Sequence, residues 1–349
     1  MSFSWRCSDQ GEYRFKIKHC SMRISKPCFI LIGAFMGAGH QKVVMLGECM
    51  LELQGEPFGQ FSQAYGGDTF NTAIYLARCM QTHAATVSYA TALGCDPLSD
   101  GLLQRWAQQG LSLELVRQIP GKLPGLYMIE LDEKGERSFH FWRDSSAARR
   151  YFDVPQTPLE ARCHEFDLLY LSGISLAILS AAARERVFAL MAQMRALGAQ
   201  VVFDNNYRPA LWADPLSAYA SFARAYELAS MALITLDDHQ QMLGVHDAEA
   251  AIAHAQKLPT PELVIKRGEA ATLVRQTPDA SWQSVPTVAV PRVVDTTAAG
   301  DSFGAGYISR RLRGESAPEA AAFGNRLAAR VIQHRGAIIE KADMQDLLP

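Results

Sequence analysis

The sequence predicts an α/β fold with a doubly wound, mostly parallel sheet, and two observations support this prediction. From residue 42 onward, short apolar runs alternate with amphipathic segments whose apolar residues recur at helical spacing. The apolar runs are also nearly continuous, which is typical of strands that are covered by helices on both faces. In such folds, ligands bind beyond the carboxyl ends of the strands. Polar residues that directly follow the apolar runs are therefore the candidate site.

The order of these segments predicts each element. The expected strands are residues 43–47, 85–91, 167–171, 200–204, 232–235 and 262–266. The expected helices are residues 69–82, 98–109, 180–197, 214–229 and 247–257. We find no internal repeat and no Pro/Gly-rich linker that would divide the body of the chain.

Two insertions, near residues 48–65 and 123–143, interrupt the alternation and are expected to be extended. The second has a hairpin pattern, with strands at 126–131 and 137–142 joined by a turn at 132–135. Strands of this kind do not fit into a sheet of parallel βα units. We therefore expect them to form a small separate sheet over the site.

Composition limits the classes of function. The chain has 349 residues, of which 48% are hydrophobic and 20% charged, so it can bury a sizeable core. The net charge of −2 gives no basic balance for nucleic acid. The seven cysteines are irregularly spaced without a Cys-x-x-Cys pair, and no His-Glu-x-x-His string occurs. A disulfide framework or a zinc site is therefore not expected, and a reducing cytoplasm fits best.

Residues 293–307 carry the strongest local signal, which we interpret as a strand, a tight turn and a helix. Val293 and Val294 end an extended run that begins near Ser284. The small residues 298–300 allow close approach of a ligand to the backbone, and Asp301 falls in the first turn of the helix. A helix N-terminus of this kind binds anions, usually phosphate. A carboxylate there is explained if Asp301 is a general base for a hydroxyl nucleophile. The alternative is an ordinary capped helix in which Asp301 only complements the dipole.

A second glycine-containing stretch, Gly66-Gly67-Asp68-Thr-Phe-Asn71, precedes the first expected helix. The glycines permit close approach to a ligand, and Asp68 and Asn71 offer hydrogen bonds that suit sugar hydroxyls. The alternative is a glycine turn in which Asp68 is the N-cap.

Both stretches resemble the signatures of the ribokinase-like (PfkB) carbohydrate kinases. The resemblance implies that Asp301 is the catalytic base, that Ala298, Ala299 and Gly300 form the anion hole, and that Gly66, Gly67, Asp68 and Asn71 bind the sugar. It further implies a ribokinase-like domain over residues 41–349 with a β-sheet lid, ATP and Mg²⁺, monovalent-cation dependence and a homo-oligomer. No string typical of a P-loop or of a protein kinase occurs.

Further strings resemble the 2-dehydro-3-deoxygluconate kinase branch of this family. They begin at Gly47, Leu123, Leu171, Asp204 and Val331. The resemblance implies ATP-dependent phosphorylation of the 6-hydroxyl of 2-dehydro-3-deoxygluconate, with Tyr127, Arg143 and Arg208 contacting the sugar acid. Many members have Tyr where this chain has Phe141, so one hydroxyl is missing here. One alternative is a kinase of a neutral sugar such as fructose or ribose, which would leave two arginines unpaired. Another is a sugar-binding regulator that has lost catalysis.

Three of these candidate residues have simpler explanations. Arg208 could form a salt bridge to Asp204. Lys266 and Gly268, which the resemblance assigns to the nucleotide, could be a solvated strand end. A further candidate, Asp238, has a functional reading from the resemblance. It lies where relatives often have the Glu of an Asn-x-x-Glu string, which implies a water-mediated role near Mg²⁺.

Residues 1–40 differ from the rest and are expected to lie outside the fold. Six of the first 26 residues are Lys or Arg, and an apolar run follows that is too short to span a bilayer. This pattern also fits a secretory signal. Because an ATP-using kinase is expected in the cytoplasm, we favour an upstream extension, with Met36 as the natural start.

Overall fold

The computed structural model describes residues 39–55, 58–131 and 137–348. The expected extension and the hairpin turn at 132–135 lie wholly or largely outside these residues. The strands are β1 (Gln41–Leu46), β2 (Met50–Gly55), β3 (Phe61–Gly66), β4 (Ala85–Leu93), β5 (Val116–Gln118), β6 (Gly125–Leu131), β7 (Arg137–Trp142), β8 (Leu168–Ser172), β9 (Gln200–Asp204), β10 (Met231–Thr235), β11 (Glu262–Arg267), β12 (Ala270–Arg275) and β13 (Gln283–Val285).

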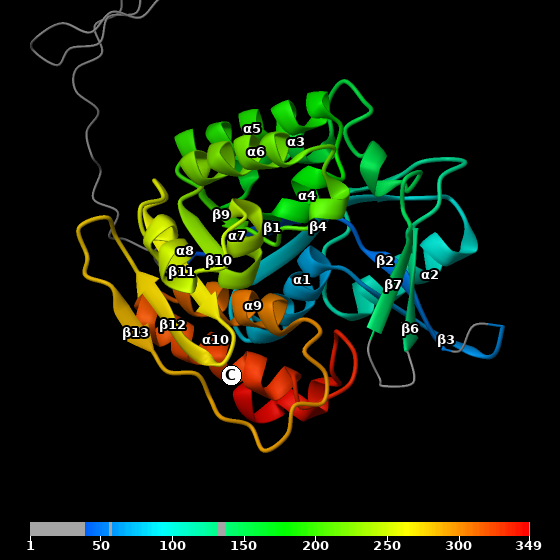
Figure 1. The fold of residues 1–349 in the computed structure, drawn as a ribbon. Helices are drawn as coiled ribbons and strands as arrows, with labels where there is room; N and C mark the ends of the chain where they lie inside the picture. The colour runs from blue at the N-terminus through cyan, green and yellow to red at the C-terminus, as the bar shows by residue number, and fades with distance from the viewer. Residues whose placement is uncertain (1–38, 56–57, 132–136, 349) are drawn as a thin grey trace, which may run out of the picture. The chain divides into compact units, whose positions relative to one another are not determined.

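Within the described residues, nine strands form a main sheet in the order β13-β12-β11-β10-β9-β8-β1-β4-β5. Its strands are parallel from β11 to β5, and β12 and β13 complete one edge in antiparallel pairing. The remaining strands form a separate sheet in the order β3-β2-β6-β7, which we call the small sheet. It lies to one side of the main sheet (Figure 1). The two insertions thus pair with each other, as the sequence predicts.

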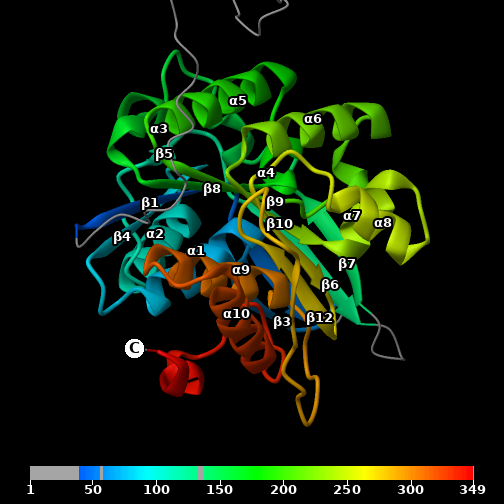
Figure 2. The same cartoon turned by 90° about the vertical axis from the view of Figure 1, so that its left-hand side faces the viewer.

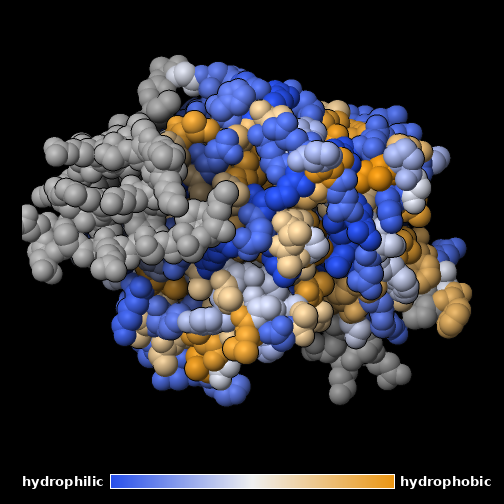
Figure 3. Space-filling model, turned by 90° about the horizontal axis from the view of Figure 1, so that it is seen from above, coloured by the Kyte–Doolittle hydropathy of each residue, from blue (hydrophilic) through white to orange (hydrophobic). Residues whose placement is uncertain are grey.

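Helices cover both faces of the main sheet. They are α1 (Asp68–Cys79), α2 (Pro97–Gln108), α3 (Pro158–Arg162), α4 (Gly173–Ala177), α5 (Ala181–Ala196), α6 (Pro215–Leu228), α7 (Leu236–Leu243), α8 (Ala248–Ala255), α9 (Ala299–Leu312) and α10 (Ala317–Val331). Helices α3, α5 and α6 lie on one face, and α1, α9 and α10 lie on the other (Figure 2). Seen from above, over α5 and α6, hydrophilic and hydrophobic residues interleave on the surface (Figure 3).

Local chemistry explains where the helices begin and how closely they pack. Asp96 caps α2 by accepting hydrogen bonds from the backbone N–H groups of Leu98 and Ser99, at 3.0 and 3.1 Å. Helices α9 and α10 approach closely because Gly306 faces Gly324: a Cβ atom at Gly306 would lie 3.1 Å from the Gly324 Cα. This contact fixes α9, which carries Asp301, against the C-terminal part of the chain.

The structure confirms each predicted strand and helix of the body to within a few residues. It also contains elements that the sequence did not predict, among them β5, β12, α7 and α10. The prediction that Val293 and Val294 end a strand is wrong. Strand β13 ends at Val285, and the chain from 286 to 296 is irregular. Val294 instead donates its N–H to the carbonyl of Ile332, at 2.8 Å.

None of the described helices is long and apolar enough to cross a bilayer.

Candidate active site

The candidate site residues gather at one edge of the main sheet. Strands β1, β8, β9, β10 and β11 are neighbours and parallel, so their carboxyl ends meet at this edge. The polar residues that follow β9, β10 and β11 are linked to one another by the contacts described below. Helices α1 and α9 pack against each other and bring their N-terminal residues Asp68 and Asp301 toward the same region.

The N-terminus of α9 provides unpaired backbone donors. Ala298 has a left-handed backbone (φ 60°, ψ 16°) that turns the chain into the helix, and the helix begins at Ala299. The N–H of Ala299 is used by the Thr296 carbonyl, at 3.2 Å. Within the described chain, the N–H groups of Gly300 and Asp301 have no acceptor. Together with the helix dipole, these groups form a cradle for an anion.

Asp295 holds the loop that leads into this cradle. One carboxylate oxygen accepts from the Thr297 N–H and the other from the Gly336 N–H, both at 2.9 Å. The loop is therefore tied to the segment that follows α10. Such support keeps a left-handed alanine in place, a conformation that costs roughly 1–2 kcal/mol.

Asp301 lies beside the cradle and is only partly exposed. The side chain of Asn71 donates to its Oδ2, at 2.8 Å. Burial raises the pKa of Asp301 to about 8, and the negative charges of Asp68 and Asp204 add to this effect. The Asn71 hydrogen bond and the charge of Lys266 oppose it. The structure thus places a carboxyl whose pKa suits a general base next to an anion cradle.

The glycine stretch before α1 is closely packed, and Gly67 has no room for a side chain. A Cβ atom at Gly67 would lie 2.2 Å from the Glu48 carbonyl oxygen, and one at Gly66 would lie 3.4 Å from the Tyr127 hydroxyl. Helix α1 begins at Asp68, and its N-cap is Gly67, so the alternative that Asp68 is the N-cap is wrong. The Asp68 side chain instead accepts a hydrogen bond from Asn206, at 2.7 Å.

Two buried acidic residues, Glu48 just before β2 and Glu52 within β2, form side-chain contacts inside the small sheet and at its end. The Tyr127 hydroxyl donates to Glu52 Oε2, and burial raises the pKa of Tyr127. Arg143 donates to Glu48 Oε2 through its Nε, at 2.9 Å, and through its Nη2. The Glu48 side chain is fully buried and that of Arg143 is 6% exposed. Phe141 is exposed, and its ring centroid lies 5.9 Å from that of Tyr127.

The predicted site arginine has a different partner from the one expected. Arg208 forms an ion pair with Asp238, at 2.9 Å, and its side chain is 50% exposed. Asp204 is paired instead with Lys266, at 2.8 Å. The alternative of an Arg208–Asp204 salt bridge is therefore wrong. Because strands β9, β10 and β11 are adjacent, their ends place these four charges in one row.

Lys266 also faces the N-terminus of α9. A Cβ atom at Gly300 would lie 3.5 Å from the Lys266 ammonium nitrogen. The cation therefore lies next to the two free N–H groups of the cradle. Gly268 is exposed, with φ 61°, at the tight turn between β11 and β12.

Sequence reasoning did not single out Glu48, Glu52, Asp204 or Asn206 as site residues. The available signal was their position, because Asp204 and Asn206 directly follow an apolar strand and both glutamates interrupt apolar runs. The described residues of the site contain no cluster of side chains typical of a protein metal site. Among the described residues, no three His, Cys, Asp or Glu side chains could together hold a metal ion.

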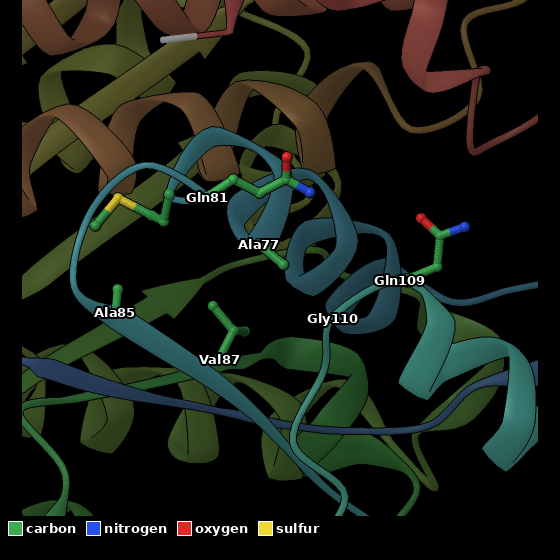
Figure 4. Close-up of a pocket in the computed structure, with 7 residues that line it drawn as sticks. Ala77, Gln81, Ala85, Val87, Gln109 and Gly110 are labelled. Atoms are coloured by element: carbon green, nitrogen blue, oxygen red, sulfur yellow. The ribbon is translucent and has the colours of Figure 1, made fainter.

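A small pocket of about 110 Å³ lies elsewhere, between the end of α1, the start of β4 and the turn after α2 (Figure 4). Ala77 and Val87 form part of its wall, and Gln81 and Gln109 also line it. None of the candidate site residues lines this pocket, so it has no bearing on the chemistry.

Comparison with known proteins supports the resemblance seen in the sequence. The chain is 43% identical over 309 residues to 2-dehydro-3-deoxygluconokinase of Escherichia coli (strain K12), covering 87% of this chain and 99% of that protein. It is 41% identical to 2-dehydro-3-deoxygluconokinase of Dickeya dadantii (strain 3937), covering 86% and 97%. A crystal structure of fructokinase from Vibrio cholerae O395 with bound fructose, ADP and calcium is 25% identical, with a TM-score of 0.73 and coverage of 89% and 99%.

The fold therefore matches that of ribokinase-like kinases. Of the three proteins compared, the two 2-dehydro-3-deoxygluconokinases are more similar in sequence to this chain than the fructokinase is. The model of the "pfkB family carbohydrate kinase" matches residues 40–343, which is nearly all of the described chain. The chain belongs to the pfkB family of carbohydrate kinases.

Proposed function

We propose that this enzyme transfers the γ-phosphoryl group of ATP to the 6-hydroxyl of 2-dehydro-3-deoxy-D-gluconate, giving the 6-phosphate and ADP. One structural observation carries the chemistry: Asp301, whose pKa is raised to about 8, is hydrogen-bonded to Asn71 of the sugar stretch and lies in the helix turn whose N–H groups at Gly300 and Asp301 are free. The identity of 43% to a 2-dehydro-3-deoxygluconokinase over nearly its whole length supports the choice of substrate.

In the proposed reaction, Asp301 takes the proton from the 6-hydroxyl as that oxygen attacks the γ-phosphorus. A new oxygen–phosphorus bond forms while the bond from the γ-phosphorus to the bridging oxygen breaks, and ADP carries away the electron pair. Of the predicted anion-hole residues Ala298, Ala299 and Gly300, Gly300 has a free N–H, which together with that of Asp301 would stabilise charge on the transferred group. The N–H of Ala299 is already bonded to the Thr296 carbonyl, so Ala298 and Ala299 would act by shaping the turn. Lys266 would contribute a full positive charge at the same place.

The sugar would be held by Gly66, Gly67, Asp68 and Asn71, and the small sheet would act as a lid through Tyr127. Nucleotide contacts are proposed for Lys266, Gly268, Ala298 and Gly300. Lys266 supports this assignment because its ammonium group lies next to Gly300, whose free N–H belongs to the cradle.

The protein contributes few ligands of its own to magnesium. Asp238 is half of an ion pair with Arg208, and the described chain offers no cluster of metal ligands. Mg²⁺ would therefore be held chiefly by ATP oxygens, with Asp238 acting through water, and would neutralise phosphate charge. A monovalent-cation requirement and a homo-oligomeric assembly remain predictions of the same proposal. We place the enzyme in the cytoplasm, where ATP is available and where free cysteines such as the exposed Cys95 persist.

Arg208 is suited to bind the carboxylate of an acidic sugar. Its Nη1 contacts Asp238 and the carbonyl of Tyr207, whereas its Nε and Nη2 donate to none of the described residues. This open edge of a planar guanidinium can accommodate a carboxylate. Arg143 has less capacity, because Glu48 already occupies its Nε and Nη2. A neutral sugar has no carboxylate to pair with the free Nε and Nη2 groups of Arg208.

The Arg208→Ala variant is therefore expected to raise the KM for 2-dehydro-3-deoxygluconate by about 10- to 100-fold, the loss expected for a charge-assisted hydrogen bond. The KM for a neutral analogue such as fructose should change far less. Steady-state kinetics with both sugars measure this difference. Arg224→Ala, which removes a surface arginine paired with Glu185, is the matched control. Equal effects of Arg208→Ala on both sugars would remove the carboxylate contact from the proposal.

The activity should also depend on pH through Asp301. A general base must be ionised, and the pKa of about 8 means that kcat/KM falls as the pH drops below 8. At pH 6 only about 1% of such a group is ionised, so kcat/KM should be about 100-fold below its plateau. The measurement is a profile of kcat/KM from pH 6 to 9.5 at saturating ATP. A flat profile over this range would contradict the assignment of Asp301 as the base.

The substrate is tested by measuring ATP-dependent ADP release with a panel of sugars. The panel contains 2-dehydro-3-deoxygluconate, its galactonate epimer, gluconate, fructose and ribose. The proposal predicts the highest kcat/KM for one of the two 2-dehydro-3-deoxy acids. Preference for fructose or ribose would favour the neutral-sugar alternative, and binding without ADP release would favour a regulator.

A further inference from the structure

The loop that follows β9 is locked to the edge of the main sheet by Asn205. Its carboxamide donates to the Thr235 carbonyl, at 3.0 Å, and accepts from the Thr235 N–H, at 2.9 Å. The same oxygen accepts from the N–H of Asn206, at 2.9 Å. Asn205 thus fixes the position of the Asn206 backbone N–H relative to β10.

Asn206 has an unusual backbone. Its φ is +20°, a region that residues other than glycine rarely adopt, although asparagine tolerates it better than most. Local strain of this kind is retained where the surrounding structure enforces it, and it is found preferentially at functional sites. The strain here sends the Asn206 side chain toward α1, where its Nδ2 donates to Asp68 Oδ2, at 2.7 Å.

The other end of the Asn206 carboxamide is unsatisfied. Its Oδ1 is buried and has no hydrogen-bond donor among the described residues. Asp68, whose Oδ2 receives the Nδ2 hydrogen bond, is itself partly exposed. Buried acceptors are normally paired, so the open Asn206 Oδ1 requires a donor from elsewhere. Sugar hydroxyls are such donors, and Asp68 belongs to the glycine stretch of the site.

We propose that Asn206 positions the sugar: its Nδ2 holds the Asp68 carboxylate in place, and its Oδ1 accepts a hydrogen bond from a sugar hydroxyl. This inference rests on the proposed function only in that a sugar enters beside Asp68. It assigns Asn206 no role at the phosphate end, because Asn206 contacts neither Asp301 nor Lys266. A change at Asn206 should therefore alter sugar binding and leave ATP binding intact.

The Asn206→Gly variant tests this directly, because glycine adopts the positive φ without strain and removes only the carboxamide. The KM for the sugar should rise about 10-fold or more, as expected for a lost hydrogen bond to a charged group, while the KM for ATP stays within about twofold. Ala210→Gly, at an exposed position of the same loop, is the control for added backbone freedom. A sugar KM within twofold of the wild type would overturn the proposal, as would equal rises for sugar and ATP.

A double-variant cycle with Asp68→Ala separates positioning from a general structural effect. If Asn206 acts through Asp68, Asn206→Gly should have a much smaller effect in the Asp68→Ala background than in the wild type. Purely additive effects on the sugar KM would contradict the coupling. Asn206→Ala restores the strain without the carboxamide, so its Tm should be lower than that of Asn206→Gly while its sugar KM is similar.

The outcome is independent of the acid-sugar assignment. The double-variant cycle is measured with whichever sugar of the panel the wild type phosphorylates. A preference for fructose would therefore overturn the substrate assignment, but the test of Asn206 would still be valid with fructose as the substrate. If no sugar is turned over, calorimetric binding of 2-dehydro-3-deoxygluconate to the same four variants provides the same comparison. Identical sugar affinities in the wild type and in Asn206→Gly would then overturn the inference.

Discussion

Replacing Asp301 by Asn is expected to lower kcat by about 1,000-fold, within the range that general-base catalysis contributes. The amide keeps the shape of the side chain and can still contact Asn71, but it cannot accept the proton of the attacking hydroxyl. The KM for the sugar should therefore change only a few-fold. Single-turnover measurements of ADP formation separate this chemical step from product release.

The same Asp301→Asn substitution, which lowers kcat, should raise the stability of the folded protein at high pH. Because the pKa of Asp301 is raised to about 8 in the folded chain, the folded state binds a proton more tightly than the unfolded chain does. This contribution to stability is complete below pH 4 and is lost as the pH rises through 8. Asn is neutral at every pH, so Asp301→Asn should have a higher Tm than the wild type at pH 8.5.

The matched control for this variant is Asp279→Asn, which makes the same substitution at an exposed position between β12 and β13. It should change neither kcat nor the Tm appreciably. If Asp301→Asn retained more than about a tenth of the wild-type kcat, the assignment of the base would be wrong. A lower Tm for Asp301→Asn at pH 8.5 would contradict the raised pKa.

Replacing Lys266 by Met is expected to reduce kcat/KM for ATP by about 100-fold, as for the loss of one charge-stabilising donor. The ammonium group of Lys266 lies next to the α9 cradle, and methionine preserves most of the volume of the lysine side chain. The same variant leaves Asp204 buried without its partner, which should cost about 3–5 kcal/mol of stability. Kinetics at varied ATP and chemical denaturation measure the two effects.

A double variant separates the two effects. Lys266→Met combined with Asp204→Asn removes both charges of the buried pair, so most of the lost stability should return. The loss in kcat/KM for ATP should persist, because the positive charge at the cradle is still absent. Recovery of activity together with stability would mean that Lys266 has only a structural role.

The contrast between these two residues shows what the sequence can and cannot predict. For Asp301, its position at a helix start after small residues indicated an anion site, and the family resemblance then favoured a catalytic base over an ordinary capped helix. The partners of Lys266 and Arg208 could not be predicted in this way. Which carboxylate each cation meets depends on the lateral order of β9, β10 and β11, and the apolar runs contain no information about that order.

The prediction of a strand ending at Val294 failed for a similar reason. Val293 and Val294 have the composition of a strand, yet none of the described strands pairs with them, and the Ile332 carbonyl accepts the Val294 N–H. The small sheet was predicted correctly because its hairpin is local and its strands alternate. Glu48 and Glu52 were missed as site residues because their function depends on contacts to Arg143 and Tyr127, far away in the sequence.

The most direct test of the central claim is the identity of the product. The purified enzyme is incubated with ATP, Mg²⁺ and 2-dehydro-3-deoxygluconate, and the product is examined by phosphorus NMR, with fructose in a parallel reaction. The account predicts a phosphomonoester whose phosphorus couples to the two protons of C6, and a kcat/KM about 100-fold higher than with fructose. Phosphorus coupled to a single proton, or faster phosphorylation of fructose, would contradict it.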